Sequence, residues 1–198
     1  MMLSLKTNDG KEISCSNVLV KAGELLAGGN IVAVKGISGY HLACNARNEG
    51  AVQKLRDRKR RKDKPFALMA KDMETVKKEC LVSCEEECLL QSCRMPIVLL
   101  HKKASCDLTG NIAPGMKRLG IMLPYTDIHA SLFCDDLDLL IMTSGNISNS
   151  PIQYKDAGAI AHLSGIADYF LYHDNAIDLP LEDSVVKVFE GKESVIRG

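Results

Sequence analysis

Short apolar runs that alternate with helix-like segments constrain the fold of this chain more than any other feature. Runs such as IVAVKG at 31–36, FALMA at 66–70 and LDLLIMTS at 137–144 have the length of buried strands. Further strands are expected at 96–102, 119–124, 167–173 and 184–190, and helices at 17–27, 48–60, 72–80, 84–93 and 155–164. This alternation predicts an α/β fold in which a mixed sheet carries flanking helices, within a single domain over residues 1–198.

Charge and hydropathy exclude several classes of protein. The chain has 25 basic and 25 acidic residues, so a uniformly basic nucleic-acid binder is disfavoured, although a local basic patch is still allowed. A membrane helix needs roughly 18 or more consecutive apolar residues, and none of the apolar runs approaches that length. The N-terminal stretch MMLSLKTNDGKEIS also lacks the apolar core of a signal peptide. We therefore expect a cytoplasmic protein that has no membrane partner.

The eight cysteines include no C-x-x-C pair, and without a secretory signal they are expected to be reduced thiols. Cys80, Cys84 and Cys88 are spaced by four, which predicts that they lie along one face of a helix. Structural zinc sites draw ligands from turns with closer spacing and a second ligand pair. We therefore expect buried, packed thiols here, and no resident metal.

The segment Arg56–Pro65 (RDRKRRKDKP) carries seven cations in ten positions. Two or three of these charges would suit the C-terminal end of a helix, where cations complement the helix dipole. Seven cations leading directly into an apolar strand are better explained by a bound anion that relieves their repulsion. Phosphate groups of a small ligand are the favoured anion, and a nucleic-acid backbone is the competing one.

Two polar segments follow buried strands. Thr143-Ser144-Gly145-Asn146-Ile147-Ser148 combines hydroxyls, an amide and a glycine at a strand end, where ligands of α/β proteins gather. On pattern alone, an anion-binding turn and a plain connection are equally supported. Lys35–His41 (KGISGYH) has two glycines that permit close backbone approach, but it matches no phosphate-loop motif. A single histidine such as His41 is more often packed than catalytic.

Two acidic pairs, Asp135-Asp136 and Glu182-Asp183, have the oxygen ligands that magnesium prefers. Adjacent acids are common on protein surfaces, so neither pair is expected to form a resident metal site.

Together these segments resemble the YrdC-like domain of HypF-type carbamoyltransferases. The stretch KGISGYHLACNARNEGAVQKLRDRKRRKDKPFALM resembles a KGIGGFHLACDA-type start followed by a basic run into KPFA. The segments APG…LGIMLPYTDIH, IMTSGNISNSPI and ADYFLYHDNAI…EDSVVKV resemble later signatures in the same order, so the resemblance covers roughly residues 28–190. Related YrdC enzymes of tRNA modification usually have SAN where this chain has Ser144-Gly145-Asn146, which favours the HypF branch.

The resemblance implies a twisted sheet around a concave basic cavity, in which ATP and carbamoyl phosphate, with Mg²⁺, yield carbamoyl-adenylate and pyrophosphate. In full-length HypF a neighbouring domain passes the carbamoyl group to HypE, for the cyanide ligands of [NiFe]-hydrogenase. The other HypF domains do not fit in 198 residues, so the chain is expected to be one domain of a larger protein.

The resemblance also assigns roles to individual residues. Arg58, Lys59, Arg61 and Lys64 are expected to contact phosphates. Thr143, Ser144, Asn146 and Ser148 would hold phosphate oxygens or the carbamoyl group, and Lys35 and His41 would line the same mouth. The chain departs from the family at Asn175 and Pro180, which stand where arginines are usual, so weaker binding of the adenylate is expected.

Two other functions remain open. YrdC-like folds have been credited with binding double-stranded RNA through a basic concave face, and the related enzymes make threonylcarbamoyl-adenylate. An RNA-binding face needs a long basic stripe, whereas the cations here are concentrated in one segment of a chain with zero net charge. The small polyanion is therefore the favoured ligand.

Overall fold

The computed structural model describes residues 2–147 and 150–198. The strands are β1 (Leu3–Thr7), β2 (Val32–Lys35), β3 (Tyr40–Asn45), β4 (Ala67–Ala70), β5 (Cys80–Leu81), β6 (Ile97–Lys102), β7 (Arg118–Met122), β8 (Leu139–Ser144), β9 (Tyr169–His173), β10 (Val185–Phe189) and β11 (Lys192–Arg197). The helices are α1 (Val18–Ala27), α2 (Glu49–Arg58), α3 (Met73–Glu79), α4 (Cys84–Leu90), α5 (Asp127–Ser131) and α6 (Asp156–Leu163), with a short 3₁₀ helix at Gly110–Ile112.

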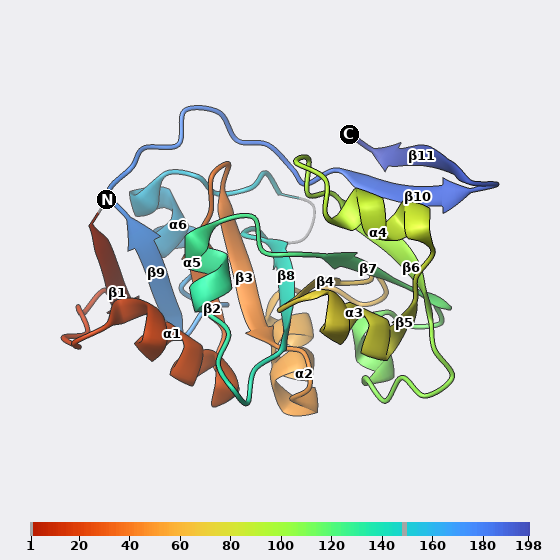
Figure 1. Ribbon diagram of the computed structural model, residues 1–198. Coiled ribbons are helices and arrows are strands. Elements are labelled where there is room, and N and C mark those ends of the chain that lie inside the picture. The colour runs from red at the N-terminus through yellow and green to blue at the C-terminus, as the bar shows by residue number, and fades with distance from the viewer. Residues whose placement is uncertain (1, 148–149) are drawn as a thin grey trace.

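The strands form one mixed sheet in the order β1-β9-β2-β3-β8-β4-β7-β6-β10-β11, and β5 pairs with β6 (Figure 1). Three neighbouring pairs are parallel, namely β2 with β9, β4 with β7, and β6 with β10. The other pairs are antiparallel, including β3 with β8, in which His41 lies opposite Ser144. The predicted α/β fold with a mixed sheet is confirmed.

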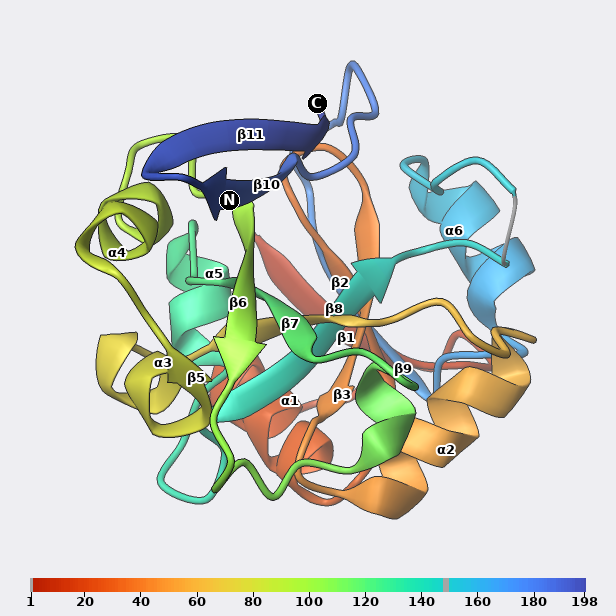
Figure 2. The ribbon, with the colours of Figure 1, turned by 90° about the vertical axis from the view of Figure 1, so that its right-hand side faces the viewer.

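Apolar residues pack on both faces of the sheet. Along β8, Leu139 and Ile141 join the core beneath α2 and α6, whereas Leu140 and Met142 join the core beneath α1 and α5. Figure 2 shows these two pairs of helices on opposite sides of the central strands. A strand buried on both faces must be apolar throughout, which explains the run LLIM. The run ends at Thr143 and Ser144, where β8 leaves the core.

Local capping sets several helix boundaries. Helix α1 begins after Asn17, whose side chain accepts hydrogen bonds from the Leu19 and Val20 amides. Helix α4 has a capping box, in which the Ser83 side chain accepts from the Glu86 amide and the Glu86 side chain accepts from the Ser83 amide. Helix α2 is capped by Asn48 and ends at Arg58.

The sequence-based prediction missed several elements. The segment after Lys35 is a hairpin that leads directly into β3, so His41 lies on a buried strand rather than in a loop. Strands β1 and β11 lie at the two edges of the sheet, where only one residue of β1 is fully buried and five of the six residues of β11 are exposed, so no continuous apolar run is required. In the described part of the chain, no helix is both long and apolar enough to cross a membrane.

Candidate functional site

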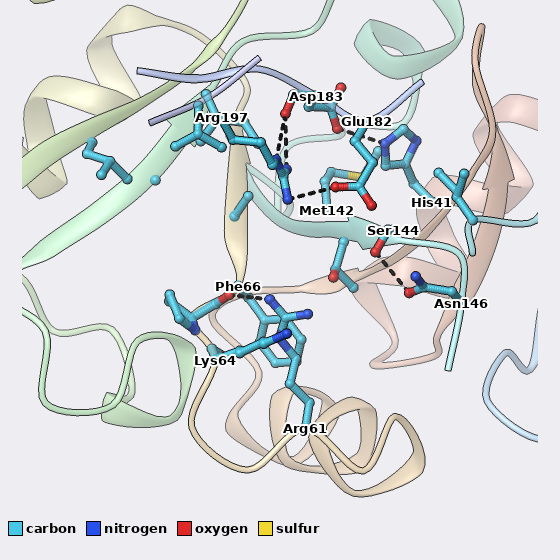
Figure 3. Close-up of a pocket in the computed structure, with 18 of the residues that line it drawn as sticks. His41, Arg61, Lys64, Phe66, Met142, Ser144, Asn146, Glu182, Asp183 and Arg197 are labelled. Carbon is cyan, nitrogen blue, oxygen red and sulfur yellow. Dashed lines mark hydrogen bonds and ion pairs between the residues drawn. The ribbon is translucent and has the colours of Figure 1, made fainter. Parts of the chain in front are cut away.

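A pocket of about 430 Å³ opens where β3 begins and β8 ends. Figure 3 shows its walls. One wall comes from residues 61–67, between α2 and β4, and the facing wall comes from residues 182–185 and from Arg197 of β11. The end of β8 and the following loop close one side, and strands β6 and β7 contribute apolar side chains on the other. The pocket therefore combines segments that are far apart in the sequence.

Arg61 and Lys64 provide the basic wall. The Arg61 guanidinium donates to the carbonyl oxygens of Lys64 at 3.1 Å and Pro65 at 2.7 Å, and it lies over the Phe66 ring. Burial, together with the nearby charges of Arg56 and Arg197, lowers the pKa of Arg61. Bringing cations together in this way favours a bound anion, because an anion relieves their mutual repulsion.

The loop after β8 is held by its own polar groups. The Ser144 hydroxyl donates to Asn146 Oδ1 at 2.9 Å, and Asn146 Nδ2 donates to the Ser150 carbonyl oxygen at 2.6 Å. A Cβ on Gly145 would lie 2.5 Å from the Tyr40 carbonyl oxygen, so the close approach of two backbones requires glycine here. Thr143, Ser144 and Asn146 all line the pocket, as expected, whereas Ser148 lies outside the described residues.

Lys59 corrects one expectation. Its side chain is fully buried beneath the loop, and Nζ donates to the carbonyl oxygens of Ser144 at 2.6 Å and Asn146 at 2.7 Å. A third hydrogen bond reaches Asn146 Oδ1 at 3.2 Å. Lys59 does not line the pocket, so it supports the loop from behind instead of presenting its charge to the cavity.

Lys35 and Arg58 also lie outside the pocket. Lys35 Nζ contacts the His173 carbonyl oxygen at 3.0 Å and Asp156 Oδ1 at 2.8 Å, and this contact ties β2 to the start of α6. Arg58 donates to Asp168 Oδ1 at 2.8 Å on the outer side of α2. Both cations are directed to acceptors within the protein, which is the physical reason that they do not join the expected cluster.

His41 lines the pocket as expected, and its partner is Asp183. The two side chains meet at 3.0 Å between Nε2 and Oδ2, with the imidazole almost fully buried. Burial raises the pKa of Asp183, but the hydrogen bond and charge of His41, with the charge of Arg197, outweigh burial and keep that pKa below its usual range. Asp183 is therefore a fixed carboxylate on the pocket wall.

A second buried imidazole lies behind this pair. The ring centroids of His129, on α5, and His41 are 6.3 Å apart, and Tyr125 contacts His129 edge-on at 4.5 Å. Neither His129 nitrogen has a hydrogen-bond partner within the described structure. Burial, with a smaller contribution from His41, lowers the pKa of His129 to about 3. His129 is consequently neutral near pH 7.

Arg197 is a pocket residue that the sequence did not reveal. It pairs with Glu182 at 2.8 Å and donates to the Asp183 carbonyl oxygen at 3.0 Å (Figure 3). These contacts attach the segment before β10 to strand β11. Asn175 and Pro180, which stand where related proteins usually have arginines, lie in the same connection between β9 and β10. Neither of these side chains lines the pocket. The cavity is therefore lined by acidic as well as basic side chains, rather than by basic side chains alone.

Comparisons with known proteins identify the family of this chain. The Sua5_yciO_yrdC family model, described as telomere recombination, matches residues 24–198. The chain belongs to the Sua5/YciO/YrdC family. This family includes P. abyssi Sua5 in complex with L-threonine, which has the same fold at 20% identity with a TM-score of 0.78 and covers 90% of this chain and 53% of that one.

Within the Sua5/YciO/YrdC family, the HypF carbamoyltransferases are much more similar. The chain is 43% identical to carbamoyltransferase HypF of Synechocystis sp., over 85% of this chain and 22% of the relative, and 47% identical to that of Rhodobacter capsulatus, over 90% and 23%. The crystal structure of T. kodakarensis HypF matches with 44% identity and a TM-score of 0.94, over 98% of this chain and 26% of that one. The chain thus spans about a quarter of the length of these relatives.

A further HypF structure was determined with bound phosphate and nucleotide. Full-length HypF in its phosphate- and nucleotide-bound form matches with 44% identity and a TM-score of 0.92, over 99% of this chain and 25% of that one. The resemblance inferred from the sequence motifs is therefore confirmed at the level of the family and of its HypF branch.

The prediction that Cys80, Cys84 and Cys88 are buried along one helix face requires a correction. Cys80 is buried as predicted, but Cys84 and Cys88 are exposed. The chain leaves helix α3 at Glu79, so Cys80 belongs to β5 while the other two cysteines belong to α4. Thus the three thiols do not share a helix face, even though their spacing is four. No cluster of three or more potential metal-binding side chains occurs among residues 2–147 and 150–198.

Proposed function

We propose that this chain binds ATP and a carbamoyl donor and joins them as carbamoyl-adenylate, with release of pyrophosphate. The observation that carries the proposal is one pocket in which Arg61 and Lys64 face the Ser144–Asn146 loop, in a chain 43–47% identical to two HypF carbamoyltransferases. The nucleotide-bound HypF structure with the same fold supports ATP as a substrate.

The proposed reaction balances when carbamate is its intermediate. Carbamoyl phosphate and water give carbamate and inorganic phosphate. One carbamate oxygen then attacks the α-phosphorus of ATP, and the bond from that phosphorus to the bridging oxygen of pyrophosphate breaks. Pyrophosphate leaves with the electron pair, and the chemistry requires no additional proton donor.

The residues of the pocket suit this displacement. Negative charge builds on the phosphate oxygens as the bond to pyrophosphate breaks, and the Arg61 and Lys64 cations line the cavity, where they would stabilise that charge. The Ser144–Asn146 loop is already ordered by its internal hydrogen bonds and by Lys59, so little reorganisation is needed when the substrates bind.

Magnesium would enter with the triphosphate. The described side chains form no dedicated metal cluster, and Mg²⁺ commonly binds substrate phosphates while it keeps several waters. We therefore assign no step to a protein-bound metal.

The proposal extends to the longer protein. Transfer of the carbamoyl group to a HypE-like acceptor, for hydrogenase maturation in the cytoplasm, would need domains beyond this chain. RNA is less favoured as a partner, because Arg56, Arg58 and Lys59 are directed to acceptors within the protein and leave a shorter basic surface.

The test is carbamate-dependent exchange of labelled pyrophosphate into ATP by the purified chain. The proposal expects exchange with ATP, Mg²⁺ and carbamate, and none when carbamate is left out or replaced by L-threonine with bicarbonate. Exchange with the threonine mixture instead would favour the threonylcarbamoyl-adenylate alternative. Salt-sensitive RNA binding that ATP does not reduce would favour the RNA-binding alternative.

A further inference from the structure

We propose that Asp183 selects the carbamoyl group, by accepting a hydrogen bond from its NH₂ group. This inference rests on the proposed function and names the residue that distinguishes carbamate from a carboxylate of the same shape. The negative charge of Asp183 is unexpected in such a site. The site must hold a polyphosphate and a carbamate, both anionic, and yet a carboxylate is fixed on its wall.

Contacts with His41 and Arg197 hold Asp183 in place at the pocket wall. Oδ2 is held by His41 Nε2 at 3.0 Å, and the Asp183 carbonyl oxygen accepts from Arg197 at 3.0 and 3.3 Å. The side chain is only 25% exposed. Within the described structure no hydrogen-bond donor contacts Oδ1. Asp183, a residue of the pocket wall, therefore has one oxygen held by His41 and one oxygen that no described donor contacts.

The support behind Asp183 is rigid. His41 lies opposite Ser144 on the neighbouring strand, and its ring is packed against buried His129. A half-buried carboxylate oxygen needs a hydrogen-bond donor or a cation, since leaving it without one costs free energy.

The pocket has an apolar end and a polar end, and these determine which part of the substrate lies next to Asp183. Ile97, Leu99 and Gly120 form an apolar end on β6 and β7, which suits a flat base. Asp183 lies on the His41 and Ser144 side of the cavity, above the loop that follows β8 (Figure 3). The reacting phosphate and the acyl group belong at this polar end. The oxygens of the reacting phosphate can only accept hydrogen bonds, so we assign the acyl NH₂ as the donor to Oδ1.

This arrangement discriminates between near-identical substrates. Carbamate and acetate are planar, anionic and of similar size, but the acetate methyl group cannot donate a hydrogen bond. A site built to bind an N–H strongly rejects the analogue that lacks it, because its acceptor is then left unpaired. We therefore expect kcat/KM for carbamate to exceed that for acetate by at least about tenfold in the unaltered chain.

The variant that tests this role is Asp183→Asn, with Asp178→Asn as a matched control. Asp178 is an exposed aspartate of the same connection and does not line the pocket. His41 would hold the asparagine oxygen, so the asparagine NH₂ would replace Oδ1 and oppose the carbamate NH₂. Pyrophosphate release is measured with carbamate and with acetate, ATP binding by calorimetry, and folding by thermal unfolding.

The proposal expects Asp183→Asn to lower kcat/KM for carbamate at least about tenfold while ATP affinity stays equal or rises, because a negative charge near the phosphates is removed. Asp178→Asn should match the unaltered chain. Equal carbamate kinetics in Asp183→Asn would overturn the assignment, and so would recovery of its activity at high Mg²⁺, which would make Asp183 a metal ligand.

The substrate comparison keeps the proposal testable if Asp183→Asn does not fold. Equal kcat/KM for carbamate and acetate in the unaltered chain would by itself overturn the role of Asp183 while leaving adenylate formation intact. Failure of the unaltered chain to release pyrophosphate with any carbamoyl donor would instead contradict the proposed function, and the assignment of Asp183 with it.

Discussion

Lys59 Nζ lies 2.6 Å from the carbonyl oxygen of Ser144 and 2.7 Å from that of Asn146, so one buried side chain holds the end of β8 and the first residues after it. The spacing of helix α2 explains this position. Lys59 follows Leu55 by four residues and Ala51 by eight, and these residues form the buried face of the helix. The lysine at the end of α2 therefore points into the protein.

Replacing Lys59 with methionine tests this supporting role. The Lys59→Met side chain keeps the apolar volume but leaves buried carbonyl oxygens without a donor, so unfolding free energy should fall by about 2–4 kcal/mol. Urea unfolding measures the change, and pyrophosphate release should fall as the loop loses its support. A variant as stable as the parent chain would show that Lys59 does not hold the loop.

Arg61 is expected to act in the pocket itself. Arg61→Ala should weaken ATP binding about tenfold or more, because each charge-assisted hydrogen bond to phosphate contributes about 1.5–3 kcal/mol. Lys62→Ala is the matched control, since it removes an equal charge one residue away from an exposed side chain outside the pocket. Titration calorimetry of MgATP compares the two, and equal affinities would contradict the assignment of Arg61.

Gly145 is expected to be intolerant of any side chain. A methyl group there would lie 2.5 Å from the Tyr40 carbonyl oxygen, so β3 and the loop would have to separate. Gly145→Ala should lower the unfolding free energy by about 1–3 kcal/mol and reduce pyrophosphate release. Gly165→Ala should have little effect, because nothing lies within 4 Å of its added Cβ. Equal denaturation midpoints for the two variants would exclude the close contact.

His129 should make the protein sensitive to acid. Its pKa is lowered to about 3 in the folded chain, so only the unfolded state takes up this proton as the pH falls from about 6.5. The folded state therefore loses up to about 1.4 kcal/mol of stability per pH unit between pH 6 and pH 4. His129→Phe should flatten this part of the stability curve.

The control for this pH dependence is His162→Phe, because His162 is an exposed histidine on α6. Its replacement should leave the slope of unfolding free energy against pH unchanged. Identical slopes for His129→Phe and the parent chain, measured by urea unfolding at each pH, would show that His129 is not held neutral by burial.

The fold was largely predictable from the sequence because its central strands are buried on both faces. Strand β8 must be apolar throughout, and the run LLIM is recognisable for that reason. Strand β3 was not recognised, since Tyr40 and His41 at its start resemble a polar loop. The outermost strand β11 has mainly exposed residues, so the sheet imposes no apolar pattern on it.

The candidate site was predictable only in part, because a run of charges does not show which side chains are buried. Among the basic residues, Arg61 and Lys64 reach the pocket, whereas Lys59 and Arg58 are directed to other parts of the protein. The helical spacing of Lys59 from Leu55 was the available signal for its burial. The contribution of Arg197 depends on pairing between distant strands, which no local pattern contains.

Isotope transfer tests the central claim, that carbamate attacks ATP in this pocket, most directly. The chain is given ATP, Mg²⁺ and carbamate labelled with ¹⁸O, and the products are analysed by mass spectrometry before the label exchanges with water. Attack by a carbamate oxygen on the α-phosphorus predicts carbamoyl-adenylate that carries both ¹⁸O atoms and pyrophosphate that carries none, and hydrolysis of the adenylate at its carbonyl carbon then leaves one ¹⁸O on AMP. Carbamoyl-adenylate without label, or label in the pyrophosphate, would contradict the account.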